Sequence, residues 1–149
     1  MRILIVSLAL LSSACGWINF GRAVPDEELR ARADVRSYYD EMAQAFASGN
    51  AEALARLFDP AIAKPMTREK ILAWGQDFFG RHGPARFKIE RVEFERLGLQ
   101  NAIVTLTYRV ETRDGEGSFA ATERDELVKR GRRWYVTGWE AVAAPAAAP

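Results

Sequence analysis

The chain has 149 residues, about the length of one domain. Its composition, 48% apolar, 28% charged and 11% aromatic, is that of a globular protein and argues against wholesale disorder, a fibre or a repeat array. With 21 Lys and Arg against 20 Asp and Glu the formal charge is +1, so we expect no nucleic-acid partner. One Cys and one His exclude an internal disulfide, a Cys-based zinc site and a His cluster, and we expect no metal and no cofactor.

Residues 1–14 are typical of a signal peptide. Arg2 supplies a positive start, and Ile3 to Leu11 is an apolar run that only Ser7 interrupts. As a helix this run covers roughly 14 Å, about half of a ~30 Å hydrocarbon core. We therefore expect a cleaved leader and not a membrane span.

Small residues lead from this run into the only cysteine of the chain, Cys15. Residues 11–16 (Leu-Ser-Ser-Ala-Cys-Gly) resemble the lipobox of bacterial lipoproteins, although Ser12 stands where Leu is usual. The resemblance implies cleavage before Cys15, acylation of that residue and a location in the cell envelope; several acyl chains together anchor a protein stably. Gly16 implies the outer membrane, with the domain facing the periplasm. The alternative is an ordinary signal peptide cleaved near Ala14.

Two segments flank the expected domain, which covers residues 26–140. Residues 15–25 read as the lipidated cysteine and a tether that reaches at most ~35 Å. In this tether, Trp17 and Phe20 either rest in the lipid interface or cover apolar surface of the domain. Residues 141–149 are an Ala/Pro tail that we expect to be disordered.

The domain begins with three predicted helices. The first starts at Pro25-Asp26 and ends at Ser48-Gly49. Asn50 caps a short second helix that stops at Asp59-Pro60, and Thr67 caps a third that stops within Gly80 to Pro84. The apolar stripes that define them are Leu29, Val35, Tyr39, Met42 and Phe46, then Leu54, Leu57 and Phe58, then Ile71, Trp74 and Phe78.

After Pro84 the apolar period changes to two, which indicates strands. Phe87 to Leu97 is expected to form a strand with a bulge near Glu90-Arg91, because the apolar residues change parity there. A long alternating strand follows over residues 102–111. Ser118 to Lys129 and Arg132 to Ala141 then make a hairpin around Arg130-Gly131.

The register of this hairpin decides which side chains of its first strand face inward. With residues 130–131 as the loop, Leu127 pairs with Trp134 and Asp125 with Val136. The inner face then carries Phe119, Ala121, Glu123, Asp125 and Leu127. A slip by one residue would turn the alternate set inward, and either set places ionisable groups inside the domain, which is unusual for a core face.

Three helices followed by long antiparallel strands make an α+β fold whose sheet must curl around the helices. Residues 39–58, with their SGNAEALARLF turn into the second helix, resemble the nuclear transport factor 2-like superfamily. Residues 123–139 (ERDELVKRGRRWYVTGW) also resemble it, and the likeness covers about residues 26–140. It implies a cystatin-like cone of three helices packed in a strongly curved sheet. This fold hosts several enzyme classes and many binding domains, so it leaves the activity open.

Members of the superfamily that resemble ketosteroid isomerase use a Tyr on the first helix, an Asp soon after the second helix and a protonated Asp on a late strand. Counted back from Gly49-Asn50, the Tyr position falls on Met42, and residues 60–66 contain no carboxylate. Only Asp125 matches the third position. Because one acid without partners cannot abstract and return a proton by that mechanism, we expect no catalytic set of this kind.

The sequence therefore predicts a membrane-anchored lipoprotein whose cone binds a small, partly apolar ligand or an envelope protein without catalysis. Tyr39, Trp74, Tyr108 and Asp125 are the expected ligand-binding residues. One alternative is a small isomerase, hydrolase or cyclase that uses Asp125, His82 and Tyr108. Another is a structural module that forms a homodimer.

Two of these residue assignments have competing interpretations. We expect His82 to cap the third helix; as a base it would need Asp125 or Glu123 to orient it. We expect a mixed charge ladder across the hairpin, between residues 123–126 (Glu-Arg-Asp-Glu) and Arg132 and Arg133. Four aromatic residues are expected to belong to the core and become ligand platforms only if a cavity separates the helices from the sheet: Trp74, Tyr108, Trp134 and Trp139.

Overall fold

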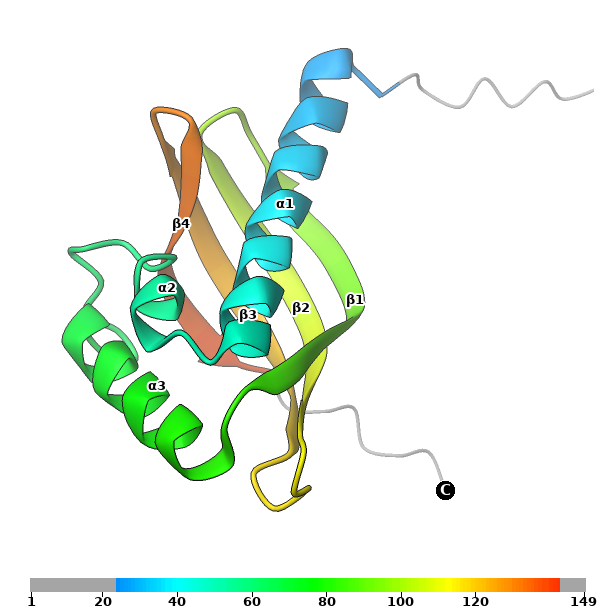
Figure 1. The fold of residues 1–149 in the computed structure, drawn as a ribbon. Helices are drawn as coiled ribbons and strands as arrows, with labels where there is room; N and C mark the ends of the chain where they lie inside the picture. Colours follow the sequence, from blue (N-terminus) through cyan, green and yellow to red (C-terminus); the bar gives the residue numbers. More distant parts are fainter. Residues whose placement is uncertain (1–23, 143–149) are drawn as a thin grey trace, which may run out of the picture.

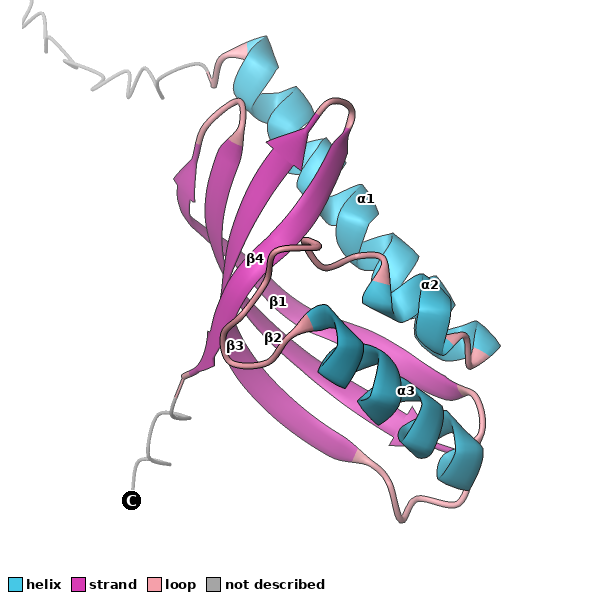
Figure 2. Cartoon of the chain, turned by 90° about the vertical axis from the view of Figure 1, so that its left-hand side faces the viewer, coloured by secondary structure: helices cyan, strands magenta, loops and turns pink. Residues whose placement is uncertain are grey.

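The computed structural model describes residues 24–142 (Figure 1). Its helices are α1 (Asp26–Ser48), α2 (Ala51–Ala55) and α3 (Arg68–His82), and its strands are β1 (Ala85–Leu97), β2 (Asn101–Thr112), β3 (Phe119–Arg130) and β4 (Arg133–Ala141). The strands pair in chain order, each antiparallel to the next. The sheet is strongly curved, and the helices lie against its concave side (Figure 2). The predicted α+β fold is confirmed.

Several expected features lie outside the described residues: the signal peptide over 1–14, the acylated Cys15 with most of the tether, and residues 143–149 of the tail. At the end of the sheet, β4 runs to Ala141, and the N–H of Val142 donates to a β3 carbonyl at 2.8 Å. Hydrogen-bonded structure thus extends two residues into the range expected to be tail. In the described part of the chain, no helix is long and apolar enough to cross a membrane.

Side-chain caps and a glycine set the helix ends where the sequence predicted them. The side chain of Asn50 accepts the N–H of Ala53 at 2.8 Å at the start of α2, and that of Thr67 accepts the N–H of Lys70 at the start of α3. Gly49 ends α1 at φ 62°, a left-handed conformation that glycine adopts at little cost. These three predicted ends are confirmed.

The second helix is shorter than predicted because the chain that follows it joins the sheet. It ends at Ala55 and not near Asp59. The Asp59 N–H donates to the Val136 carbonyl at 2.8 Å, and the Val136 N–H donates to the Leu57 carbonyl at 3.2 Å. These bonds form a short parallel bridge between Phe58 and β4, which takes the backbone groups that a longer helix would have used.

The bend of β1 follows from two irregularities in its pairing with β2. The register of β1 shifts between Ile89 and Arg91, which confirms the predicted bulge, and again between Phe94 and Arg96. Each bulge bends the strand and raises its twist, so together they help the sheet to curl around α1.

The β3–β4 hairpin differs from the predicted register. Its loop is residues 131–132 and not 130–131, and Leu127 pairs with Val136 and not with Trp134. Gly131 has φ 63°, and no residue other than glycine has a positive φ in the described chain. A positive φ at only the first of two loop residues is the type II′ pattern, which favours glycine first.

A bulge after Glu126 then places Asp125 opposite Trp139 and not Val136. The predicted inner face of β3 nevertheless holds, since Asp125 and Leu127 are both buried. Moving a two-residue loop by one position changes the partner of Leu127 by two residues, and the side-chain period of a strand is also two. The bulge adds one more residue of β4 before the partner of Asp125 and leaves β3 itself continuous. The wrong loop position therefore left the predicted inner face unchanged.

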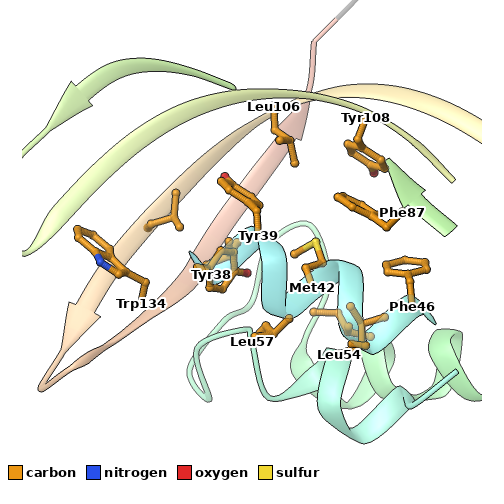
Figure 3. Close-up of a cluster of buried hydrophobic side chains, with 14 of the residues drawn as sticks. Tyr38, Tyr39, Met42, Phe46, Leu54, Leu57, Phe87, Leu106, Tyr108 and Trp134 are labelled. Carbon is orange, nitrogen blue, oxygen red and sulfur yellow. The ribbon is translucent and has the colours of Figure 1, made fainter. Parts of the chain in front are cut away.

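The core lies between α1 and the concave face of the sheet (Figure 3). Val35 and Tyr39 from α1 and Val104 and Val110 from β2 are fully buried there. Leu29, which was predicted to continue the apolar stripe of the first helix, is 51% exposed. It lies near the start of α1, where the helix extends past the sheet and has no strand to cover it (Figure 1).

Candidate functional site

A cavity of about 310 Å³ lies between the helices and the concave face of the sheet. This volume is at the lower end of the roughly 300–1,000 Å³ that small-molecule pockets occupy. Trp74 lines the cavity from α3 and is 38% exposed. Most of the remaining lining is aliphatic or aromatic, and its other aromatic side chains are Phe46, Phe58, Phe87, Tyr108, Phe119 and Trp139.

Two acids from β3, Glu123 and Asp125, are the charged side chains among the lining residues. They stand two residues apart and therefore share the inner face of the strand. The hydroxyl of Tyr39, from α1, donates to Asp125 Oδ2 at 2.7 Å. The hydroxyl of Tyr108, from β2, donates to Glu123 Oε1 at 2.8 Å. Each cavity acid is thus held by one tyrosine from a neighbouring element.

Burial makes Asp125 an unusually weak acid. Its side chain is 4% exposed, and loss of water raises its pKa to about 7. The hydrogen bond from Tyr39 lowers this pKa, and the nearby carboxylate of Glu123 raises it. Near neutral pH, both protonation states of Asp125 are therefore populated.

The pKa values of Glu123 and of its hydrogen-bond partner Tyr108 are both raised. Burial raises the pKa of Glu123, and the hydrogen bond from Tyr108 lowers it. Burial also raises the pKa of Tyr108, and the negative charge of Glu123 raises it further. Tyr108 therefore remains a hydroxyl that donates its proton to the acid.

The structure brings three of the four expected ligand-binding residues to this cavity: Trp74, Tyr108 and Asp125 line it. Tyr39 does not line it, because its ring is fully buried between α1 and the sheet. Its hydroxyl donates to Asp125 although the ring does not line the cavity, so Tyr39 acts as a positioning residue for that acid.

His82, which the enzymatic alternative requires, is not among the lining residues. Its Nδ1 lies 3.1 Å from Asp114 Oδ2, in the loop between β2 and β3. Neither Asp125 nor Glu123 is its partner. His82 is the last residue of α3, as the sequence predicted, and it joins the end of that helix to the loop between β2 and β3. The set of Asp125, His82 and Tyr108 is therefore not assembled.

The predicted charge ladder between the acidic segment of β3 and Arg132 and Arg133 is wrong. Arg133 pairs with Glu41 of α1, and the two inward acids bind tyrosines. Arg124 points to the opposite face, where it pairs with Glu95 at 2.9 Å and Glu140 at 3.4 Å. Strand alternation explains the difference, because successive residues of β3 face opposite sides of the sheet.

Sequence reasoning did not assign two parts of the cavity wall to the site. Glu123 was placed on the inner face but considered as a partner for His82 or for the arginines across the hairpin; its shared parity with Asp125 was the available signal. Phe58 and Trp139 lie with ring centroids 5.3 Å apart. The bridge between Phe58 and β4 brings these two rings together, and no local sequence pattern marks such a long-range contact.

Within residues 24–142, no three His, Cys, Asp or Glu side chains gather closely enough to hold a metal ion. The cavity thus offers two tyrosine-bound acids inside an aromatic and aliphatic wall.

A curved antiparallel sheet that wraps around helices is the cone fold of solved structures described as nuclear transport factor 2-like and cystatin-like. A protein of unknown function from Mycobacterium tuberculosis matches with TM-score 0.67 and 15% identity, over 82% of this chain and 77% of that one. A nuclear transport factor 2-like protein of unknown function from Shewanella oneidensis matches with TM-score 0.61 and 13% identity, over 74% and 97%.

A domain of unknown function with a cystatin-like fold from Nostoc punctiforme matches with TM-score 0.60 and 17% identity, over 79% of this chain and 80% of that one. Neither a protein-family model nor a curated protein sequence matches the chain. At these identities the likeness shows the fold, and the function has to be argued from the cavity.

Proposed function

We propose that the cone binds a small, largely apolar ligand in its cavity without making or breaking bonds. The observation that carries this proposal is a cavity of about 310 Å³ whose wall is apolar apart from a few polar groups. Ligand pockets usually combine these two properties, since the apolar wall provides affinity and the polar groups fix orientation.

A neutral apolar dye, N-phenylnaphthylamine, tests this proposal, because its fluorescence rises in an apolar site. We expect saturable binding to the wild-type domain. Met66→Trp, which enlarges a partly exposed side chain of the cavity wall, is expected to weaken binding at least about tenfold. Leu99→Trp adds the same ring at an exposed position of the β1–β2 turn and is the control. Equal binding by both variants would contradict the proposal.

The same proposal places the domain at the cell envelope through an acylated Cys15. Its support is the lipobox-like segment 11–16 after an apolar run too short to span a bilayer. Growth with an alkyne fatty acid is expected to label the wild type and to leave Cys15→Ser unlabelled. We also expect wild type to fractionate with the outer membrane and Cys15→Ser to be released in soluble form. An unlabelled wild-type protein would contradict acylation and leave the cavity proposal standing.

One observation favours a second candidate, a small isomerase, hydrolase or cyclase. Asp125 has a pKa of about 7 beside a cavity, and such a carboxyl can exchange protons at neutral pH. Turnover of a cavity ligand that Asp125→Asn abolishes, and that Glu126→Gln on the outer face leaves intact, would establish this candidate in place of simple binding.

A further inference from the structure

We infer that the cavity is specific for an apolar amine: a ligand with one protonated nitrogen directed at Asp125 and Glu123 and an aromatic or alicyclic body against the cone wall. This inference rests on the proposed function and adds the chemical class of the ligand. Three properties of the cavity lead to it: its hydrogen-bonding groups, its charge and its aromatic lining.

The two acids of the cavity provide hydrogen-bond acceptors. The tyrosine bonds use Oδ2 of Asp125 and Oε1 of Glu123, and they use the hydroxyl protons of Tyr39 and Tyr108. Oδ1 of Asp125 and Oε2 of Glu123 have no side-chain partner among the described residues. An ionised carboxylate only accepts hydrogen bonds, so the complementary ligand group is one that donates.

The charge of the cavity points the same way. Glu123 and Asp125 line it, and no Lys, Arg or His does. A carboxylate in an apolar site is costly unless a positive group pairs with it. The lining residues include no positive group that could pair with the two acids, and the tyrosine hydrogen bonds offset burial only in part, so the pKa of each acid stays raised. A ligand ammonium would supply the positive group, whereas a ligand carboxylate or phosphate would add repulsion.

The aromatic lining suits both parts of such a ligand. The faces of Trp74, Trp139 and Tyr108 carry negative charge density that attracts a cation, and their area packs against an apolar body.

Three probes with one body and different heads test the inference: phenylbutylamine, phenylbutanol and phenylbutyrate. Each probe is titrated into a complex of the full-length protein with N-phenylnaphthylamine, and the fall in dye fluorescence measures displacement. We expect the amine to compete at least about tenfold better than the alcohol, and the alcohol better than the acid. Equal or tighter competition by the alcohol or the acid would overturn the amine inference while the proposed function stands. Failure of the dye and of all three probes to bind would overturn both.

Asp125→Asn and Glu123→Gln remove one charge each and keep an oxygen that accepts the tyrosine proton. We expect either change to weaken the amine at least about tenfold and to leave the alcohol within about twofold. Glu126→Gln removes one charge from the same strand on the outer face and is the matched control, with unchanged affinity for all three probes. A loss for the alcohol equal to that for the amine would indicate a structural effect and contradict charge recognition.

Proton release gives an independent readout. The groups that face Asp125 are Tyr39 from α1, Tyr108 from β2 and Glu123 from its own strand, and β4 places Trp139 opposite it. Tyr38, also on α1, senses the charge of Asp125 but is not bonded to it. An ammonium favours the ionised acid, so below the pKa of about 7 amine binding is expected to expel a proton. Calorimetry in two buffers of different ionisation enthalpy measures this. Binding of the amine without proton release below that pKa would contradict pairing with Asp125.

Discussion

Tyr38 and Tyr39 are adjacent and buried, yet their hydroxyl groups are in different situations. Tyr39 donates to Asp125, whereas the hydroxyl of Tyr38 and the indole N–H of Trp134 have no hydrogen-bond partner in the described chain. A helix turns about 100° per residue, so neighbours point in different directions and only one of the two tyrosines reaches the acid. The difference in hydrogen bonding separates the energetic roles of these two residues.

We expect Tyr39→Phe to lower the free energy of unfolding by roughly 1–3 kcal/mol, because it leaves a buried acid without its donor. Tyr38→Phe removes a hydroxyl without a partner and is expected to cause no loss. Urea unfolding of both variants measures the contrast. Tyr39→Phe should also raise the pKa of Asp125 above about 7, which a carbon NMR titration of the carboxyl detects. Equal losses from the two variants would contradict this assignment.

The pH dependence of stability follows from the raised pKa of Asp125. Its pKa is about 7 in the folded protein against ~3.9 in an unfolded chain. The folded state therefore binds the proton more tightly, and this stabilisation is full below about pH 4 and is lost as the pH rises through about 7. A pKa difference of this size corresponds to on the order of 4 kcal/mol.

Asp125→Asn cannot titrate, so we expect the free energy of unfolding of this variant to rise relative to wild type between about pH 4 and pH 7. Denaturant unfolding across this range measures the difference. For Glu126→Gln we expect the same pH dependence of the free energy of unfolding as for wild type, because this side chain is exposed on the outer face. An Asp125→Asn curve that also runs parallel to wild type would show that the acid is not destabilised by burial.

At the scale of elements, α2 and α3 meet at a glycine. A Cβ on Gly75 would lie 3.1 Å from the Cβ and 3.4 Å from the Cα of Ala51. Gly80, on the same helix, has nothing within 4 Å of such a Cβ. Because α3 carries Ile71 and Trp74 of the cavity wall, the separation of the two helices also sets the position of that wall.

We expect Gly80→Ala to stabilise the protein by roughly 0.5–1 kcal/mol through helix propensity. Gly75→Ala makes the same change at the helix contact and is expected to destabilise, since the added methyl group pushes against Ala51. Thermal unfolding of the pair measures the difference. Dye binding should weaken for Gly75→Ala alone. If both variants were stabilised equally, α2 and α3 could move apart at no cost, which would contradict the close contact at Gly75.

At the scale of the whole molecule, Asp59 connects the helical part to the sheet. Its backbone N–H bonds Val136 of β4, and its side chain accepts the N–H of Ala61 at 2.8 Å and of Arg130 at 2.6 Å. Burial opposes ionisation of Asp59, but these two donors hold its pKa below the ordinary value. The contact lies beside Phe58 and Val136, so it also holds one side of the cavity.

Asp59→Asn is expected to lower the free energy of unfolding by roughly 1–3 kcal/mol at neutral pH, because a buried partner of Arg130 loses its charge. Since the pKa of Asp59 is lowered on folding, this loss should shrink as the pH falls through that pKa. Asp77→Asn, at an exposed pair on α3, is the control and should change stability by less than about 0.5 kcal/mol. Equal effects of both changes would contradict the connecting role.

The sequence by itself determined the features that depend on neighbouring residues. Helix ends at Gly49, Asn50 and Thr67 and the bulge near Glu90 follow from caps, glycine and side-chain period, which act over a few residues. The side-chain period also places Glu123, Asp125 and Leu127 on one face of β3, but the register of the hairpin decides whether that face lies inward, and the tertiary structure set this register.

Only the tertiary structure decided which distant groups meet. Tyr39 and Asp125 are 86 residues apart, and His82 found Asp114 and not a cavity acid. Such pairs depend on how far the sheet curls and how closely the helices approach it, and small bends at bulges, summed along four strands, set both quantities. The cavity itself is a product of that geometry, since it is the volume that the curved sheet and the helices leave between them.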